Sequence, residues 1–196
     1  MFKNIIQTLK YRTSLKVPHP THWARVIMNI RCAELIKELD YTKMNTLEIS
    51  GDNWKNFGFG SYNNKAYPAF DITKEVTQEK YDLIIAEQVF EHLKYPYRAA
   101  KNIYEMLNHG GYFLVSTPFL IKIHDCPIDC SRWTPLGMKY FLEEAGFTFE
   151  NIFSEGWGNR KCVNANYKKW VNFNNLLHPL RNEHDFPIHI WALAKK

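Results

Sequence analysis

The segment from residue 123 to residue 133 carries several side chains that could take part in catalysis. His124, Asp125, Asp129 and Arg132 all lie within it. An imidazole takes up a proton near neutral pH and a carboxylate can orient it, so His124 with Asp129 could remove the proton of an acceptor hydroxyl. Asp125 and Arg132 are then candidates for binding a polar substrate. The alternative is a solvated loop in which Asp129 and Arg132 form an ion pair.

A second candidate base is His92, with Glu91 beside it as a carboxylate that could orient the ring. The alternative for this pair is a structural role. Cys126 and Cys130 also lie close to a histidine, and their spacing occurs in zinc sites. A closed structural zinc site needs four ligands, however, and Cys162 is the only other nearby candidate in the sequence. We therefore expect free, partly buried thiols and no metal.

The segment after residue 153 is rich in tryptophan, asparagine and basic residues. Trp157, Asn159 and Arg160 are candidates for binding a sugar or another polyhydroxyl compound, because aromatic faces stack on rings while amides and guanidinium groups donate hydrogen bonds. Tyr167 and Trp170 could extend such a site. An ordinary cap over the core or a dimer surface would explain the same composition.

Three apolar runs end in polar or flexible residues, which is where an open parallel sheet binds its ligands. The first run, at residues 44–52, ends with Glu48, Ser50 and Gly51. The second, at residues 81–88, ends with Glu87 and Gln88, and the third, at residues 112–119, ends in Ser-Thr-Pro. Continuous apolar runs of this length are typical of strands that are buried on both faces.

Helical patterns alternate with these strands. Residues 21–40 have Thr21 as a possible N-cap and an apolar stripe, residues 97–109 are followed by Gly110 as a stop, and residues 134–145 begin with Thr-Pro and end at Gly146. Residues 53–68 predict a loop and a short strand, and residues 147–153 and 187–194 predict two more strands. The helix-free stretch before the last strand would let it enter antiparallel.

These elements predict an α/β fold: a Rossmann-like, doubly wound sheet of about six or seven mostly parallel strands with an antiparallel last strand and helices on both faces. We expect one domain over residues 1–196. Residues 1–40 would form an N-terminal helical cap, residues 41–153 the core, and residues 154–196 a C-terminal cap with the last strand.

Composition narrows the possible functions. The chain has 196 residues, 45% of them hydrophobic, and a net charge of +5. The basic residues are dispersed, which argues against a nucleic-acid partner. Four cysteines are too few for a disulfide framework, so we expect a cytoplasmic protein. We expect it to be a monomer or a homodimer. No apolar run could span a bilayer, but the basic, partly apolar residues 1–16 could contact a membrane surface or form a short helix packed on the domain.

Four segments together resemble the class I S-adenosylmethionine (SAM) dependent methyltransferases that act on small molecules. They are LEISG, FDIT, YDLIIAEQVFEHLKYPYRAAKNIYEMLNHGGYFLVSTPF and RWTPLGMKYFLEEAGF, and the likeness covers about residues 44–153. The resemblance implies SAM as the cofactor. It places Glu48, Ser50 and Gly51 by the methionine part of SAM, Asp71 and Ile72 by its adenosine, and Glu87 and Gln88 along its other side.

The chain departs from the family pattern after the first strand. Ser50-Gly51-Asp52-Asn53-Trp54 stands where the family has G-x-G-x-G, and the helix that usually follows is shortened or lost. Ala66 or Tyr67 stands where an acidic residue usually binds the ribose. Asp71 is therefore open to three interpretations: an adenine contact, a ribose contact or a turn residue.

The resemblance predicts methyl transfer, and the polar segment around His124 predicts a hydroxyl acceptor. We expect a sugar of a surface glycan or a nucleotide sugar. Alternatives are a quinone or another lipid-like molecule, and a binding protein of the same fold that has lost catalysis. The modest charge argues against a nucleic-acid acceptor.

Overall fold

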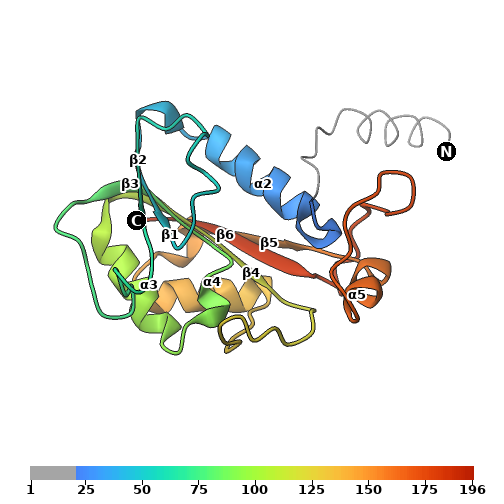
Figure 1. Ribbon diagram of the computed structural model, residues 1–196. Helices are drawn as coiled ribbons and strands as arrows, with labels where there is room; N and C mark the ends of the chain where they lie inside the picture. Colours follow the sequence, from blue (N-terminus) through green and yellow to red (C-terminus); the bar gives the residue numbers. More distant parts are fainter. Residues whose placement is uncertain (1–20) are drawn as a thin grey trace.

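A computed structural model describes residues 21–196 of the chain (Figure 1). The predictions made for residues 1–20, a membrane contact or a short packed helix, lie outside the described residues. Within the described part, no helix is both long and apolar enough to cross a membrane.

The described helices and strands alternate along most of the chain. The helices are α2 (Val26–Lys37), α3 (Pro96–Met106), α4 (Pro135–Glu144) and α5 (Arg160–Asn166). Short 3-10 turns lie at η1 (Trp23–Arg25), η2 (Tyr41–Lys43), η3 (Phe90–His92) and η4 (Phe149–Asn151). The strands are β1 (Asn45–Ile49), β2 (Ser61–Lys65), β3 (Tyr81–Glu87), β4 (Leu107–Pro118), β5 (Ile152–Trp157) and β6 (His189–Lys195).

The six strands form one sheet in the order β2-β1-β3-β4-β6-β5. Strands β1 to β4 pair in parallel, and β6 pairs antiparallel with both β4 and β5. The predicted mostly parallel sheet with an antiparallel last strand is therefore confirmed. Because β1, β3 and β4 point the same way, the residues that follow Ile49, Glu87 and Pro118 meet at one edge of the sheet.

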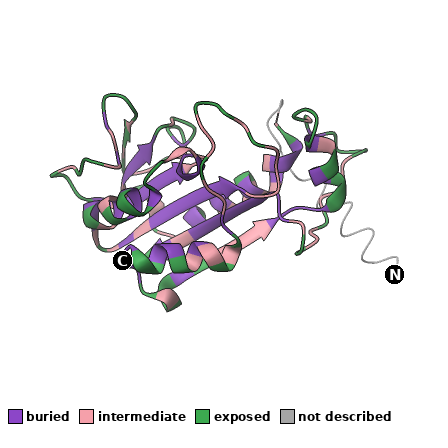
Figure 2. Ribbon diagram, turned by 90° about the horizontal axis from the view of Figure 1, so that it is seen from below, coloured by how far each residue is buried: buried purple, intermediate pink, exposed green. Residues whose placement is uncertain are grey.

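Two hydrophobic clusters cover the two faces of the sheet. Alternate residues of β3 separate between them: Ile84 packs with α3 and α4, and Leu83 packs with α2, η1 and α5. Figure 1 shows α2 on one side of the sheet and α3 and α4 on the other, and Figure 2 shows the strands as the most continuously buried part. Helices thus lie on both faces, as a doubly wound sheet requires.

The predicted start of the first helix was wrong. Thr21 does not cap α2, which follows the 3-10 turn η1 and has Arg25 at its N-cap position with no side-chain cap. The start is fixed instead by a distant contact, since the amide of Trp23 donates to the carbonyl of Val171 (2.8 Å). A contact between residues so far apart in the chain leaves no local sequence signal.

The prediction that Gly110 stops the helix expected at residues 97–109 was also wrong. Helix α3 ends at Met106 and β4 begins at the next residue, so that Gly110, with φ of +79°, lies within the strand. The side chain of Lys196 donates to the carbonyls of Tyr104 in α3 (2.6 Å) and of Leu107, the residue that follows the helix (2.9 Å). A basic side chain from the C-terminus thus replaces the expected glycine cap.

Two predictions in the C-terminal part need correction. The strand expected at residues 147–153 lies at Ile152–Trp157, because Phe147 is buried against the rings of Tyr104 and Phe113 instead of pairing in the sheet. The stretch before the last strand contains the short helix α5, which begins where Asn159 accepts a hydrogen bond from the Cys162 amide (2.8 Å).

Candidate functional site

Two strained residues mark the carboxyl edge of the sheet. Ser50 follows β1 with φ of 58°, and Gln88 follows β3 with φ of 57°. The left-handed region disfavours side chains other than glycine, and such residues gather at functional sites when the surrounding fold holds them in place. Since β1 and β3 are neighbours in the sheet, these two turns lie side by side. The resemblance had placed both residues at the cofactor.

Glu48 fixes the loop that replaces the glycine-rich turn. Its buried carboxylate accepts hydrogen bonds from the amides of Asn53 (3.2 Å) and Trp54 (3.0 Å) and from the hydroxyl of Tyr62 (2.6 Å). Burial raises the pKa of Glu48, and these three donors oppose that shift. A Cβ at Gly51 would lie 2.4 Å from the same carboxylate, so a side chain there would push Glu48 away from its hydrogen bonds.

Glu87 closes the other side of this loop. It forms an ion pair with Arg25 and accepts a hydrogen bond from the indole of Trp54 (3.0 Å). Trp54 therefore bonds to both strand-end carboxylates, through its amide to Glu48 and through its ring to Glu87. No helix forms between residues 51 and 60, as predicted, and these contacts hold the loop in its place.

The loop after β1 offers two backbone amides that fit the methionine carboxylate of SAM. Within residues 21–196, the amides of Gly51 and Asp52 donate to no other group, and they lie beside the strained turn at Ser50. Unpaired amides at a strand end suit a carboxylate ligand. Gln88, on the neighbouring turn, contacts Ser116 (3.4 Å) and His189 (3.1 Å) through its amide.

Asp71 is held in a local turn. Its carboxylate accepts from the amide (3.0 Å) and hydroxyl (2.6 Å) of Thr73 and pairs with Lys74 (3.1 Å), contacts that lower its pKa. Ile72 is buried, and its carbonyl accepts from Asn102 (2.7 Å). Strand β2 ends at Lys65, so Ala66 does follow the second strand where the family has an acidic residue.

A cavity of about 210 Å³ lies next to the Gln88 turn. It is built from distant parts of the chain: the η1 region, the turn after β3, the segment after β4, and the start of β6. Most of its lining residues have polar side chains, and four of them are histidines; the lining residues are His22, Ala24, Arg25, Gln88, Glu91, His92, Ile121, His124, Trp170 and His189.

His124 and Asp129 form the pair that the sequence predicted. His124 Nδ1 lies 3.0 Å from Asp129 Oδ2, and the His124 amide donates to the same oxygen (3.0 Å). Arg132 pairs with both oxygens of Asp129. Burial acts to raise the pKa of Asp129, but Arg132 and the His124 amide outweigh it and hold the pKa at about 2. Asp129 is thus a carboxylate at neutral pH, and it contacts both the guanidinium of Arg132 and the imidazole of His124.

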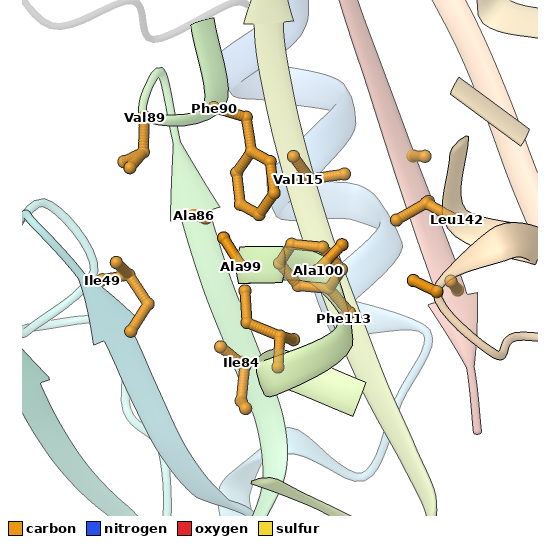
Figure 3. Close-up of a cluster of buried hydrophobic side chains, with 14 of the residues drawn as sticks. Ile49, Ile84, Ala86, Val89, Phe90, Ala99, Ala100, Phe113, Val115 and Leu142 are labelled. Carbon is orange, nitrogen blue, oxygen red and sulfur yellow. The ribbon is translucent and has the colours of Figure 1, made fainter. Parts of the chain in front are cut away.

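Glu91 and His92 lie on η3, directly after Phe90. Figure 3 shows Phe90 pointing into the cluster of hydrophobic side chains over β3 and β4, which anchors this turn. His92 Nδ1 donates to the carbonyl of Ile128, and the amide of Cys130 donates to the carbonyl of Glu91 (2.7 Å). These contacts join η3 to the segment that carries His124. The two imidazole rings lie 5.1 Å apart.

The Glu91 side chain is fully buried, and its two oxygens find no hydrogen-bond partner within the described chain. Burial raises the pKa of Glu91 to about 8. His189 also lines the cavity and is buried; burial and the charge of Arg25 lower its pKa to about 3, so its ring is neutral.

None of the five predicted substrate residues lines the cavity. Arg132 is bonded to Asp129. Asp125 is exposed on the segment before Asp129. Trp157 is buried and donates to the Leu180 carbonyl (3.0 Å), while Asn159 caps α5. Arg160 lies on the surface and pairs with Glu183 (2.8 Å). Cys126 and Cys130 are exposed, not partly buried as expected, and are free thiols.

Sequence reasoning missed several residues of the cavity. Arg25 lies in a segment interpreted only as a helix, and His22 and His189 lie at element ends without a motif. Trp170, for which the sequence left a sugar contact, a cap and a dimer surface open, does line the cavity and lies against His124 with ring centroids 6.1 Å apart. The four cavity histidines are far apart in the sequence, so nothing in their spacing indicates that they line one cavity.

The comparisons with known proteins agree with this fold and site. Residues 22–150 match the model of a methyltransferase domain family. A search of curated proteins found no match. The match covers more than half of the chain, and the chain belongs to this family of methyltransferase domains. Membership confirms the predicted class and its cofactor, SAM.

Solved structures share the fold at low sequence identity. A SAM-dependent methyltransferase from Mesorhizobium loti is 13% identical, with a TM-score of 0.56 over 88% of this chain and 98% of that one. A phosphoethanolamine N-methyltransferase from Haemonchus contortus is 13% identical, with a TM-score of 0.56 over 86% and 52%. The O-methyltransferase of a polyketide synthase from Brevibacillus brevis is 15% identical, with a TM-score of 0.54 over 93% and 82%.

Proposed function

We propose that this protein transfers a methyl group from SAM to a hydroxyl of a small polar acceptor, and that the acceptor is a sugar of a surface glycan or of a nucleotide sugar. The observation that carries the proposal is that His124, oriented by Asp129 behind it, lines a cavity that Gln88 joins to the cofactor side. The structural relatives include both an N- and an O-methyltransferase, so the fold alone does not choose the acceptor atom.

The cofactor supplies an electrophilic methyl group on a sulfonium. We assign the amides of Gly51 and Asp52 to its methionine carboxylate, and the Ile72 and Gln88 turns to its remaining length. Asp71 is engaged in its own turn, which favours a positioning role for it over a direct ribose contact. These roles follow from the family resemblance together with the turn geometry.

His124 takes the proton of the acceptor in this proposal. Asp129 is a carboxylate and accepts from Nδ1, so the lone pair of the neutral ring is on Nε2. With SAM bound, the acceptor oxygen would take the methyl group, and Nε2 would hold the proton that the hydroxyl gives up. Asp129 stabilises the resulting imidazolium, and His92 lines the wall beside it.

The cavity has room for a single ring of the acceptor, so the rest of a glycan or nucleotide sugar would lie outside it. Its volume of about 210 Å³ is below the roughly 300–1,000 Å³ of typical ligand sites. Trp170 offers an aromatic face for a sugar ring, while Arg25 and His22 offer polar contacts to hydroxyls. Since Trp170 belongs to residues 154–196, we assign this C-terminal segment the role of a cap over the acceptor. A nucleotide-sugar acceptor implies a reaction in the cytoplasm, carried out by a monomer or a homodimer.

The test combines binding with turnover. Calorimetric titration of the full chain with SAM and with S-adenosylhomocysteine should show binding of both. Transfer of labelled methyl from SAM to a panel of monosaccharides and nucleotide sugars should then show product, and His124→Asn should abolish it while changing SAM affinity little. Binding without transfer to any hydroxyl compound would favour the lapsed binding protein. Full activity in His124→Asn would exclude its role as the base.

A further inference from the structure

Three potential metal ligands face one another in the cavity. One atom each from Glu91, His92 and His124 can be chosen so that all three lie within 4.8 Å of one another. His92 Nε2 and Glu91 Oε1 are 3.7 Å apart. Zinc bonds of about 2.0–2.2 Å to nitrogen and oxygen place neighbouring ligands roughly 3–4 Å apart, so small side-chain rotations would close the site around an ion.

The hydrogen bonds outside the cluster leave lone pairs inside it. A carbonyl can only accept, so His92 must donate from Nδ1 to Ile128 and carry its lone pair on Nε2. The carboxylate of Asp129 likewise makes His124 Nδ1 a donor. Metal-binding histidines are held in this way, with one ring nitrogen bonded to a carbonyl or carboxylate and the other turned to the ion.

Glu91 is the independent sign of a missing ligand. Its side chain is fully buried and lines the cavity, and neither oxygen has a hydrogen-bond partner among the residues of the described chain. A buried carboxyl group without partners is costly. A proton on Glu91 does not remove this cost, because His92 Nε2 at 3.7 Å is too far away to accept a hydrogen bond.

The charge balance around the cluster suits a cation. Arg132 is bonded to both oxygens of Asp129, and Arg25 is paired with Glu87, so each guanidinium has its own carboxylate. Glu91 is the carboxyl group without such a pair in this part of the structure. We propose that Glu91, His92 and His124 bind a divalent transition-metal ion such as Zn²⁺, with Asp129 and the Ile128 carbonyl as outer-shell partners. Two imidazoles and one carboxylate are ligands that such ions prefer.

This proposal deepens the proposed function, and the role of the ion rests on that function although its binding does not. An ion at this point lowers the pKa of a hydroxyl that coordinates it. It thereby takes over the task assigned above to the free imidazole, and His124 becomes a ligand. The exposed thiols of Cys126 and Cys130, which we considered as zinc ligands from the sequence and then rejected, are not ligands in this proposed site.

The experiment measures metal binding by the full chain without any acceptor. The Cys126→Ser/Cys130→Ser variant serves as the background, so that exposed thiols cannot bind the probe. After chelator treatment, Co²⁺ is titrated and followed by its visible absorption, and Zn²⁺ is titrated by calorimetry. We expect one ion per chain.

The variants of the cluster are compared in this background. Glu91→Gln, His92→Asn and His124→Asn should each weaken binding at least about 100-fold, and Asp129→Asn by about 10–100-fold. The matched control is His109→Ala, an exposed histidine at the opposite end of β4, which should bind as the background does. Melting curves and SAM titration confirm that each variant is folded.

Three results would overturn the proposal: no stoichiometric binding in the wild-type chain, loss of binding in the cysteine background, or equal affinity in the ligand variants and in His109→Ala. Failure of the proposed function looks different. Intact metal binding without methyl transfer to any hydroxyl compound would contradict the proposed function and support the metal site. Full methyl transfer by chelated protein that binds no ion would contradict the metal site and support the proposed function.

Discussion

Asp129 provides a quantitative test of how the segment at residues 123–133 is held. Its pKa falls from 3.8 to about 2 in the folded chain, chiefly because Arg132 and the His124 amide outweigh the effect of burial. Each pKa unit corresponds to about 1.4 kcal/mol, so the charged carboxylate contributes about 2–3 kcal/mol to the stability of the chelated protein at neutral pH. Asp129→Asn should lower the free energy of unfolding by at least this amount, since Arg132 then loses its partner.

The pH dependence gives this prediction its sign. Because the pKa is lower in the folded than in the unfolded chain, the contribution is complete above about pH 4 and is lost as the pH falls toward 2. The difference between wild type and variant should therefore be constant from pH 7 to about pH 5 and shrink below pH 4. Urea unfolding followed by tryptophan fluorescence, in the presence of a chelator, measures it at each pH.

The matched control is Asp125→Asn, which removes an exposed carboxylate from the same segment. Surface substitutions of this kind change stability by less than about 0.5 kcal/mol. If Asp129→Asn is no more destabilising than Asp125→Asn at pH 7, or if its effect does not diminish on acidification, the structural account of Asp129 is wrong.

Three further substitutions test the frame around the site. Phe90→Ala removes a fully buried ring and should cost about 3–5 kcal/mol in urea unfolding, with Phe90→Leu costing less. Tyr62→Phe removes a donor from the buried carboxylate of Glu48 and should cost about 1–3 kcal/mol; an unchanged stability would mean that this hydrogen bond does not form. Gly158→Ala places a Cβ 2.0 Å from the carbonyl of Phe186, so a melting curve like that of wild type would contradict the packing of the last strand.

The strand ends could be predicted from sequence because they depend on local patterns. A continuous apolar run followed by polar residues predicts a buried parallel strand and its carboxyl edge, and both β1 and β3 follow this rule. The Thr134–Pro135 start of α4 is also local, and the structure confirms it through the hydrogen bond from the Gly137 amide to Thr134 (3.0 Å).

What failed depends on contacts between distant parts of the chain. Lys196 caps α3 across some ninety residues, which made Gly110 a misleading stop signal. The cavity is a similar case: Arg25 and His189 meet Gln88 only because β6 enters beside β4. Side chains that line a cavity in this way have no common period in the sequence, so only the folded chain brings them together.

The altered turn after β1 shows how one departure from the family pattern is accommodated by others. In a glycine-rich turn, the amides at the start of the following helix hold the loop and bind the ligand. Here Trp54 gives its amide to Glu48 and its indole to Glu87, which frees the Gly51 and Asp52 amides from holding the loop. Arg25, from η1, balances the charge of Glu87. Side-chain hydrogen bonds therefore hold this turn, where a helix N-terminus holds a glycine-rich turn. Unlike a glycine-rich turn, it also depends on a residue of η1, Arg25, which pairs with Glu87.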